Sequence, residues 1–350
     1  MKILALDLGK SKSVACIYET SGEAAAGTHR FETIPTTPAA VLELIEREAP
    51  GRLVIEIGPT AGWVCDLCRA RGLPVEVANP NHEAWRWKSV KRKSDRDDAL
   101  KLARLSAMGQ LPTVHVPTPA VREWRGLIAY RHSLVGRLTA VKNSIRAVLM
   151  RRAIEWPKGP AGWGKAALAE LARMSGEGDE VWRLVLHEEL EHFKGLESSI
   201  ARVEERLAAI AKEDERVALL RTIPGVGPRL AETAVAVIDD PHRFKNGKQV
   251  GCYAGLTPRR YQSGSMDRQG KISGAGHELL RSLLVEVSWL GRRWNPWMKG
   301  VYERALRGSP SRKKIAIVAL ARRLLVVCWA MLRDRTPWRE PQGAALSLAA

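Results

Sequence analysis

Four acidic residues occupy positions from which they could bind divalent cations. Asp7 lies in the apolar run KILALDLGKS, Glu56 lies in RLVIEIGP, and Asp95 and Asp98 open a predicted helix in KSDRDDALKLARL. An ionised carboxylate inside an apolar strand is costly unless an opposite charge pairs with it. Asp95 and Asp98 can share an ion because their spacing places both on one helical face. The pattern predicts a site for Mg²⁺ or Mn²⁺, where two ions could stabilise the attacking and leaving oxygens of a phosphate displacement.

A serine in a basic, glycine-rich segment is the second group that could do chemistry. Ser263 lies within residues 252–290, and its hydroxyl could serve as a nucleophile or help to cradle a phosphate. Composition alone favours an ordinary polar loop for it. The cations around this serine are Arg259, Arg260, Arg268 and Lys271.

Another basic run precedes the predicted acidic helix and alternates tryptophans with cations. Such alternation suits base stacking and phosphate contact, and a core pair of tryptophans beneath a solvated basic face is an equal alternative. The cations of this run are Arg86, Lys88, Lys91, Arg92 and Lys93.

The overall charge predicts a polyanionic partner. The 350 residues contain 56 Lys and Arg against 38 Asp and Glu, a net charge of +18, so binding should depend strongly on salt. The longest apolar run, 315–332, is interrupted by two arginines, which predicts a buried helix and no membrane span. Five scattered cysteines indicate a reduced, cytoplasmic protein. Cys65 and Cys68 have no second pair to complete a zinc site, so they are predicted to be small residues on one helical face.

The first 112 residues alternate between strand and helix patterns. The predicted order is three antiparallel strands, a helix, a strand, a helix, a strand and the acidic helix, which matches a ribonuclease-H-like mixed sheet. Ser94 is the expected N-cap of the acidic helix, with Asp97 as its partner. The predicted strands are 3–8, 13–19, 29–34, 53–57 and 74–78, and the helices are 38–48, 61–71 and 94–108.

The rest of the chain reads as mainly helical. Two long helices, 119–150 and 179–213, have heptad-like apolar spacing that favours an antiparallel pair or a dimerising coiled coil, with a bundle core as an equal alternative. Gly225 and Gly227 lie in IPGVGP between two helical patterns, as in a helix-hairpin-helix, where such glycines let backbone N–H groups approach a DNA phosphate. Plain packing is the alternative. The predicted domains are 1–112, 113–215 and 216–340, followed by a tail, 341–350.

Five motifs, in this order, resemble those of DEDD transposases of the insertion-sequence-110 family, which includes the Piv-type DNA invertases. They are ALDLGKSKSV, VIEIGPTAGW, KSDRDDALKLA, IPGVGP and YAGLTPRRYQSG…GKISGAGHELLRSLL, and they span nearly the whole chain. The chain departs from the family pattern in two places: it has Gln262-Ser263-Gly264-Ser265 where two serines followed by two glycines are frequent, and Gly274 where a lysine is usual.

The resemblance implies a RuvC-like domain, a coiled-coil middle and a small C-terminal domain with a nucleophilic serine. By this resemblance Asp7, Glu56, Asp95 and Asp98 bind metal and Ser263 attacks DNA; spacing alone leaves Ser265 and Ser273 open as the nucleophile. Members of the group are recombinases that use a structured guide RNA, which pairs with donor and target DNA. The implied partners are DNA, a guide RNA and further copies of the chain in a dimer or tetramer, near the nucleoid of a prokaryote.

Three other functions compete with this metal-dependent, serine-using recombinase. A RuvC-like Holliday-junction nuclease, cutting by metal-activated water, needs the four acids but not Ser263. A sugar-kinase-like or actin-like ATPase is suggested by LDLGKSKS, but the sequence has no suitably placed second phosphate loop or adenosine-binding Gly-Gly. A non-catalytic DNA-binding protein leaves the acids in apolar strands unexplained.

Overall fold

The computed structural model describes residues 1–20, 27–80, 94–264 and 266–339. The chain forms two compact units, Met1–Arg122 and Glu123–Ala350. This division does not test the predicted boundaries, so three domains and a tail stay a prediction. The following sequence-predicted residues lie outside the described ones: Arg86, Lys88, Lys91, Arg92, Lys93 and Ser265.

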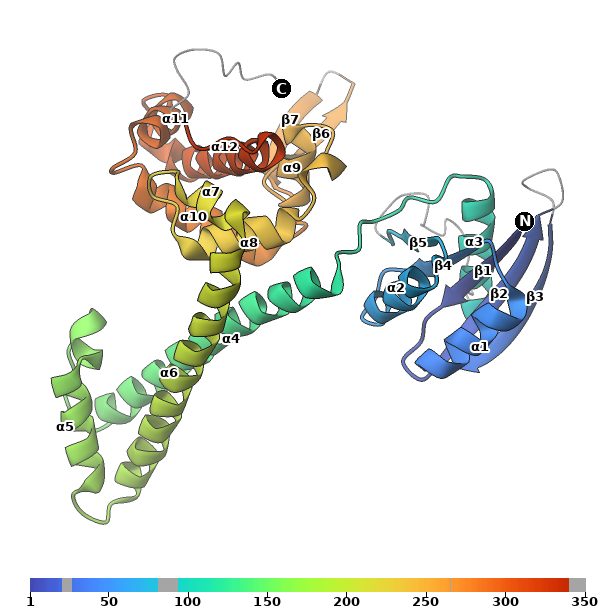
Figure 1. Cartoon of the computed structure of the whole chain (residues 1–350). Coiled ribbons are helices and arrows are strands. Elements are labelled where there is room, and N and C mark those ends of the chain that lie inside the picture. The colour runs from blue at the N-terminus through green and yellow to red at the C-terminus, as the bar shows by residue number, and fades with distance from the viewer. Residues whose placement is uncertain (21–26, 81–93, 265, 340–350) are drawn as a thin grey trace. The chain divides into compact units, whose positions relative to one another are not determined.

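A five-stranded mixed sheet forms the centre of the first unit, in the order β3-β2-β1-β4-β5 (Figure 1). Strands β1, β2 and β3 are antiparallel neighbours, whereas β1, β4 and β5 run parallel. This is the ribonuclease-H-like arrangement predicted from the sequence. The strands are β1 (Lys2–Asp7), β2 (Lys12–Thr20), β3 (Gly27–Pro35), β4 (Arg52–Glu56) and β5 (Val75–Ala78).

Helices cover both faces of this sheet, which explains why its central strands are apolar without alternation. Helices α1 (Pro38–Glu48) and α2 (Ala61–Ala70) pack on the face that carries Leu4 and Leu6. Helix α3 (Asp95–Ala107) packs on the other face, which carries Ile3, Ala5 and Val54. Figure 1 shows α3 on the opposite side of the sheet from α1 and α2.

The cysteine pair of α2 belongs to the first of these layers. Cys65 and Cys68 are buried against the sheet, and burial raises the pKa of the Cys68 thiol to about 12. Both therefore act as small apolar core residues, as predicted.

Two long antiparallel helices begin the second part of the chain. Helix α4 (Pro119–Met150) and α6 (Val181–Glu213) are joined by hydrogen bonds from Arg131 to Glu204 and from Ser144 to Glu189, whose opposite order along the helices fixes their direction (Figure 1). Between them lie a short 3₁₀ helix, Gly159–Trp163, and α5 (Lys165–Gly176), which completes their core. The pair lies within one chain, and a coiled coil between two chains stays a prediction.

The remaining helices surround α12 (Lys313–Asp334), a core helix as predicted. One helical stretch, Pro310–Asp334, is long and apolar enough to cross a membrane. Of its most apolar 18-residue segment, 56% is buried inside the fold. The helices around it are α7 (Glu215–Arg221), α8 (Pro228–Ile238), α9 (Gly247–Tyr253), α10 (Glu278–Gly291) and α11 (Pro296–Leu306), with 3₁₀ turns at Pro241–Arg243 and Pro310–Arg312.

A two-stranded antiparallel hairpin interrupts these helices where a loop was predicted. Its strands are β6 (Pro258–Ser263) and β7 (Met266–Ile272), and Ser263 pairs with Met266 across a two-residue turn. Gly264 has a φ of +55°, a conformation that glycine adopts at little cost. The loop prediction for Ser263 was wrong because the strands are polar and exposed, so they lack the apolar alternation by which strands are normally recognised.

Candidate active site

Asp7 and Glu56 are brought to one edge of the sheet by the pairing of their strands. Leu6 pairs with Ile55 in the parallel register of β1 and β4, so Asp7 and Glu56 follow as the final residues of neighbouring strands. Parallel strands lie about 4.8 Å apart. In open sheets of this kind, ligands bind beside the carboxyl ends of the strands.

Both side chains also lie on the face of the sheet that α3 covers. Residues two apart in a strand share a face. Ala5 and Val54 pack in the cluster formed with α3, and Asp7 and Glu56 each follow them by two positions. The sheet therefore presents two half-buried carboxylates toward the layer of α3.

Helix α3 adds Asp98 to this layer and leaves Asp95 at the surface. Asp98 is 7% exposed and lies next to the buried Ala99, whereas Asp95 is exposed. The predicted capping box begins the helix: the Asp97 carboxylate accepts from the Ser94 backbone N–H (3.0 Å) and hydroxyl (2.6 Å), while Ser94 Oγ accepts from the Asp97 N–H. These bonds lower the pKa of Asp97, so its role is capping, as predicted.

Helix α3 crosses the sheet between its two outer strands. Near its start, the Arg96 guanidinium lies 5.7 Å from the Phe31 ring of β3. Near its end, Ser106 Oγ donates to Glu76 of β5 at 2.5 Å. The helix is thus held at both ends over the central strands that end in Asp7 and Glu56.

The donor chemistry of these residues fits Mg²⁺ or Mn²⁺, because carboxylate oxygens are the ligands that both hard cations prefer. Three of the four carboxylates lie in one layer between the sheet and α3. Within the described ranges, however, no three His, Cys, Asp or Glu side chains are close enough together to form a ready metal-binding group. The four-ligand set therefore stays a prediction, supported by strand register and donor type.

Ser263 lies at the exposed end of β6, next to the hairpin turn. Arg260 is already engaged by Asp267, with Nε and Nη2 donating to the two carboxylate oxygens at 2.8 and 2.6 Å, and this pairing lowers the pKa of Asp267. Arg268 and Lys271 are exposed and form no ion pair with any described residue. Arg259 donates to the Ser273 carbonyl at 3.3 Å, so among the described residues Arg260 is the one predicted cation here that a carboxylate engages.

Two glycines that sequence reasoning missed clamp the base of this hairpin. Gly255 and Gly276 both have positive φ values, +69° and +93°. A Cβ at Gly255 would overlap the carbonyl oxygen of Ala275, and a Cβ at Gly276 would overlap that of Tyr253. The two backbone segments thus cross in direct contact, joined by a 2.8 Å hydrogen bond from the Ser273 N–H to the Thr257 carbonyl.

The IPGVGP loop joins α7 to α8 and packs against the protein on one side. Gly225 has a φ of +95°, and a Cβ there would lie 3.4 Å from the Cα of Gly291. Asn295 Nδ2 donates to the Pro224 carbonyl at 3.0 Å, and Gly227 is the N-cap of α8. Gly225 therefore has a packing role, whereas Gly227 begins α8 with no atom within 4 Å of an added Cβ, and a DNA contact by either glycine stays a prediction.

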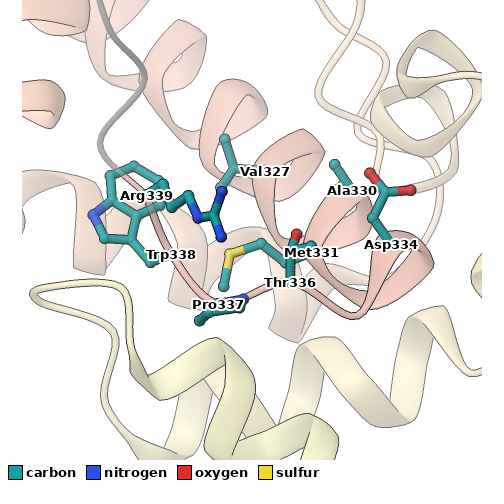
Figure 2. A pocket seen from close by; sticks show the side chains of 8 residues that line it. All are labelled: Val327, Ala330, Met331, Asp334, Thr336, Pro337, Trp338 and Arg339. Carbon is teal, nitrogen blue, oxygen red and sulfur yellow. The ribbon is translucent and has the colours of Figure 1, made fainter.

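A separate pocket lies at the end of α12 and contains none of the predicted site residues. It has a volume of about 220 Å³ and is formed by α12 and the segment that follows it, as Figure 2 shows. The residues that line it are Val327, Ala330, Met331, Asp334, Thr336, Pro337, Trp338 and Arg339.

Comparison with known proteins connects both units to one family. A model described as "Transposase IS116/IS110/IS902 family" matches residues 217–303, and the DEDD transposase model of the IS110 group, described as "Transposase", matches residues 4–152. A solved structure of Thermus thermophilus RuvC in complex with a Holliday junction substrate covers 33% of this chain and 99% of its own, at 18% identity and a TM-score of 0.27.

Among curated proteins, the transposase for insertion sequence element IS1111A of Coxiella burnetii is 26% identical over 97% of this chain and 92% of its own length. The pilin gene-inverting protein of Moraxella lacunata is 37% identical over 35% of this chain and 38% of its own. The two family models fall on the carboxylate unit and on the region that contains the hairpin. The chain belongs to the IS110 family of DEDD transposases.

Proposed function

We propose that this transposase cuts and rejoins DNA strands with divalent metal at the sheet edge and with Ser263 as nucleophile. The observation that carries the first part is the common edge and face of Asp7 and Glu56, beside the layer that holds the buried Asp98. Family membership supports DNA as the substrate.

The proposed metal ligands are Asp7, Glu56, Asp98 and the exposed Asp95. Bound Mg²⁺ or Mn²⁺ would supply positive charge to the oxygens of the scissile phosphate. The strands fix the backbone of Asp7 and Glu56, and the capping box fixes the first turn of α3, from which both aspartates project. The protein's own contribution is thus the placement of oxygen donors on rigid elements.

Ser263 would form a covalent link to DNA. Its Oγ bonds to the scissile phosphorus, the bond from phosphorus to one deoxyribose oxygen breaks, and the hydroxyl proton of Ser263 ends on that leaving oxygen as a free DNA hydroxyl. The serine–phosphate ester keeps the bond energy for rejoining in the reverse reaction. Exposure of Ser263 at the end of β6 supports this role, because DNA can reach it.

The test is the capture of a protein–DNA adduct with Mg²⁺ present. We expect wild-type protein to form an adduct that survives denaturation, and both Ser263→Ala and Asp7→Asn to abolish it. Ser273→Ala, within the same segment, is the matched control and should retain the adduct. Strand cleavage by Ser263→Ala with no adduct in any variant would instead favour the junction nuclease that uses metal-activated water.

We also propose a guide RNA and a homo-oligomer as partners. The net charge of +18 supports a polyanionic partner but does not identify it. The protein should be isolated from cells that carry its whole element, and the co-purified RNA sequenced. A discrete RNA from beside the gene would support guidance, whereas DNA bound without any specific RNA would favour recognition by the protein alone.

A further inference from the structure

A second basic site lies on the helical pair, where the connector between α4 and α5 folds back. Trp163, at the end of the connector's 3₁₀ helix, stacks on Phe193 of α6, with ring centroids 5.5 Å apart and an interplanar angle of 19°. The connector has a defined shape: Trp156 Nε1 donates to the Gly162 carbonyl at 2.9 Å, and a Cβ at Gly162 would overlap the carbonyl oxygen of Pro157. The stacking on Phe193 and the fixed backbone of the preceding Gly162 therefore hold Trp163 in place.

Two cations from one face of α4 lie against this aromatic pair. Lys142 Nζ is 5.3 Å from the centre of the Trp163 ring and 5.4 Å from that of Phe193. The Arg146 guanidinium, one helical turn later, is 5.0 Å from the centre of Trp163. Cation–π contacts restrict both side chains without neutralising their charge.

These groups line an open concave site of about 480 Å³, within the range of roughly 300–1,000 Å³ that ligand sites occupy. Among the described residues, neither Lys142 nor Arg146 forms an ion pair or donates a hydrogen bond, so their donors are available. Glu197 is the one carboxylate among the residues that line the site. The site thus has an excess of positive charge and fixed donors.

The charge around the connector extends this excess. Lys158 and Lys165 flank the 3₁₀ helix, both are exposed, and neither is ion-paired within the described parts of the chain. A guanidinium binds the oxygens of a phosphate in a planar, two-point geometry, and an ammonium binds them as a point charge. An open site with several such cations suits a continuous polyanion better than a small enclosed ligand.

We propose that Lys142, Arg146 and the connector that carries Trp163 bind the phosphodiester backbone of a nucleic-acid strand. The inference rests on the proposed function only in that the partner is a nucleic acid. It adds a contact surface on the helical pair, apart from the carboxylates and the hairpin. DNA and RNA share this chemistry, and the test distinguishes them.

The experiment measures binding of the full-length protein to a short DNA duplex and to a single-stranded RNA, each across a series of salt concentrations. The slope of log K against log salt falls by about 0.9 for each lost phosphate contact on duplex DNA and by about 0.7 on a single strand. Lys142→Gln combined with Arg146→Gln should therefore lower the slope by about two contacts on the ligand that occupies the site. Loss on one ligand alone identifies that ligand as DNA or RNA.

Arg137→Gln is the matched control for Arg146→Gln, because it removes the same charge from an exposed position on the same helix. We expect the control to keep the wild-type slope and the charge-retaining Arg146→Lys to keep most of it. Equal slopes for wild type and the double variant, or equal losses at positions 137 and 146, would overturn the proposal. So would a change in molecular mass by light scattering with no change in slope, which would indicate a contact between copies of the chain.

Circular dichroism of each variant excludes unfolding as the cause, and Lys142→Arg offers a second charge-retaining variant if glutamine disturbs the packing. Binding is measured without divalent metal, so no strand is cut. A failure of the serine or metal chemistry would leave these salt slopes unchanged, and the two proposals can therefore fail separately.

Discussion

Asp7 and Glu56 end two neighbouring parallel strands, one position beyond the paired residues Leu6 and Ile55, on the sheet face that α3 covers. Strand register alone thus places two carboxylates side by side. Their separation in the sequence conceals this relationship, which the hydrogen-bonded ladder between β1 and β4 creates.

Neutralising either carboxylate should slow strand cleavage strongly without unfolding the protein. We expect Asp7→Asn and Glu56→Gln to lower the cleavage rate by about two orders of magnitude or more, the loss typical of removing one group that stabilises transition-state charge. The midpoint temperature of thermal unfolding should stay close to that of the wild type, because neither side chain is part of the apolar core. Glu43→Gln, at an exposed position of α1, is the control and should cleave normally.

The N-cap of α3 should set the stability of the turn that carries Asp95 and Asp98. Ser94→Ala removes the side-chain acceptor for the Asp97 N–H and should cost about 1 kcal/mol. Hydrogen exchange of the amides in the first turn of α3 should rise, and the amides of α2 should be unaffected. Unchanged exchange in that first turn would show that packing on the sheet holds the helix start without the cap.

The crossing at the base of the hairpin should tolerate no side chain. Gly276→Ala combines a left-handed φ with an overlap of backbone atoms, whereas Gly274→Ala has a similar φ, +66°, with no atom within 4 Å of the new Cβ. The control should lose only the cost of the left-handed conformation, about 1–2 kcal/mol. Urea unfolding should show a clearly larger loss for Gly276→Ala, and equal losses would contradict a close crossing.

A buried carboxylate in the first unit should make the free energy of unfolding depend on pH in the acid range. Arg30 donates to Glu48 at 2.6 Å, Arg47 and Lys2 also contact it, and these partners hold the pKa of Glu48 at about 2, below its ordinary 4.5. Because the folded-state pKa is lowered, this stabilisation is complete above pH 4.5 and is lost as the pH falls toward 2.

Glu48→Gln should therefore be less stable than wild type at neutral pH, and the difference should shrink below pH 4.5. Urea unfolding across this range measures it. A difference that does not vary with pH would mean that Glu48 contributes by packing and not by charge.

Much of the first unit could be predicted because its signals are local. The apolar runs around Asp7 and Glu56, the turn residues between them and the Ser94–Asp97 capping box each act within a few positions. That Asp98 faces the sheet while Asp95 stays at the surface depends on how α3 docks, which the sequence pattern did not resolve.

The hairpin and its base were less accessible to sequence reasoning. The available signal was the Gly264-Ser265 dipeptide, which is typical of a two-residue turn between strands. The approach of Gly276 to Tyr253 joins segments from both sides of the hairpin, and no local pattern reports such a contact. Helix α5 was also missed, although KAALAELARM consists almost entirely of strong helix formers.

The backbone crossing at Gly255 and Gly276 divides the hairpin region into a part that can be exchanged and a part that cannot. Residues 259–264 and 266–269 lie beyond the crossing, and their exposed strands make few demands on the rest of the fold. Protein engineers can therefore transplant the hairpin tip between relatives or vary it in a library, provided that Ser263, the proposed nucleophile, and the cations Arg259, Arg260 and Arg268 are kept. The glycines beneath it must be kept as a fixed anchor in every member of such a library.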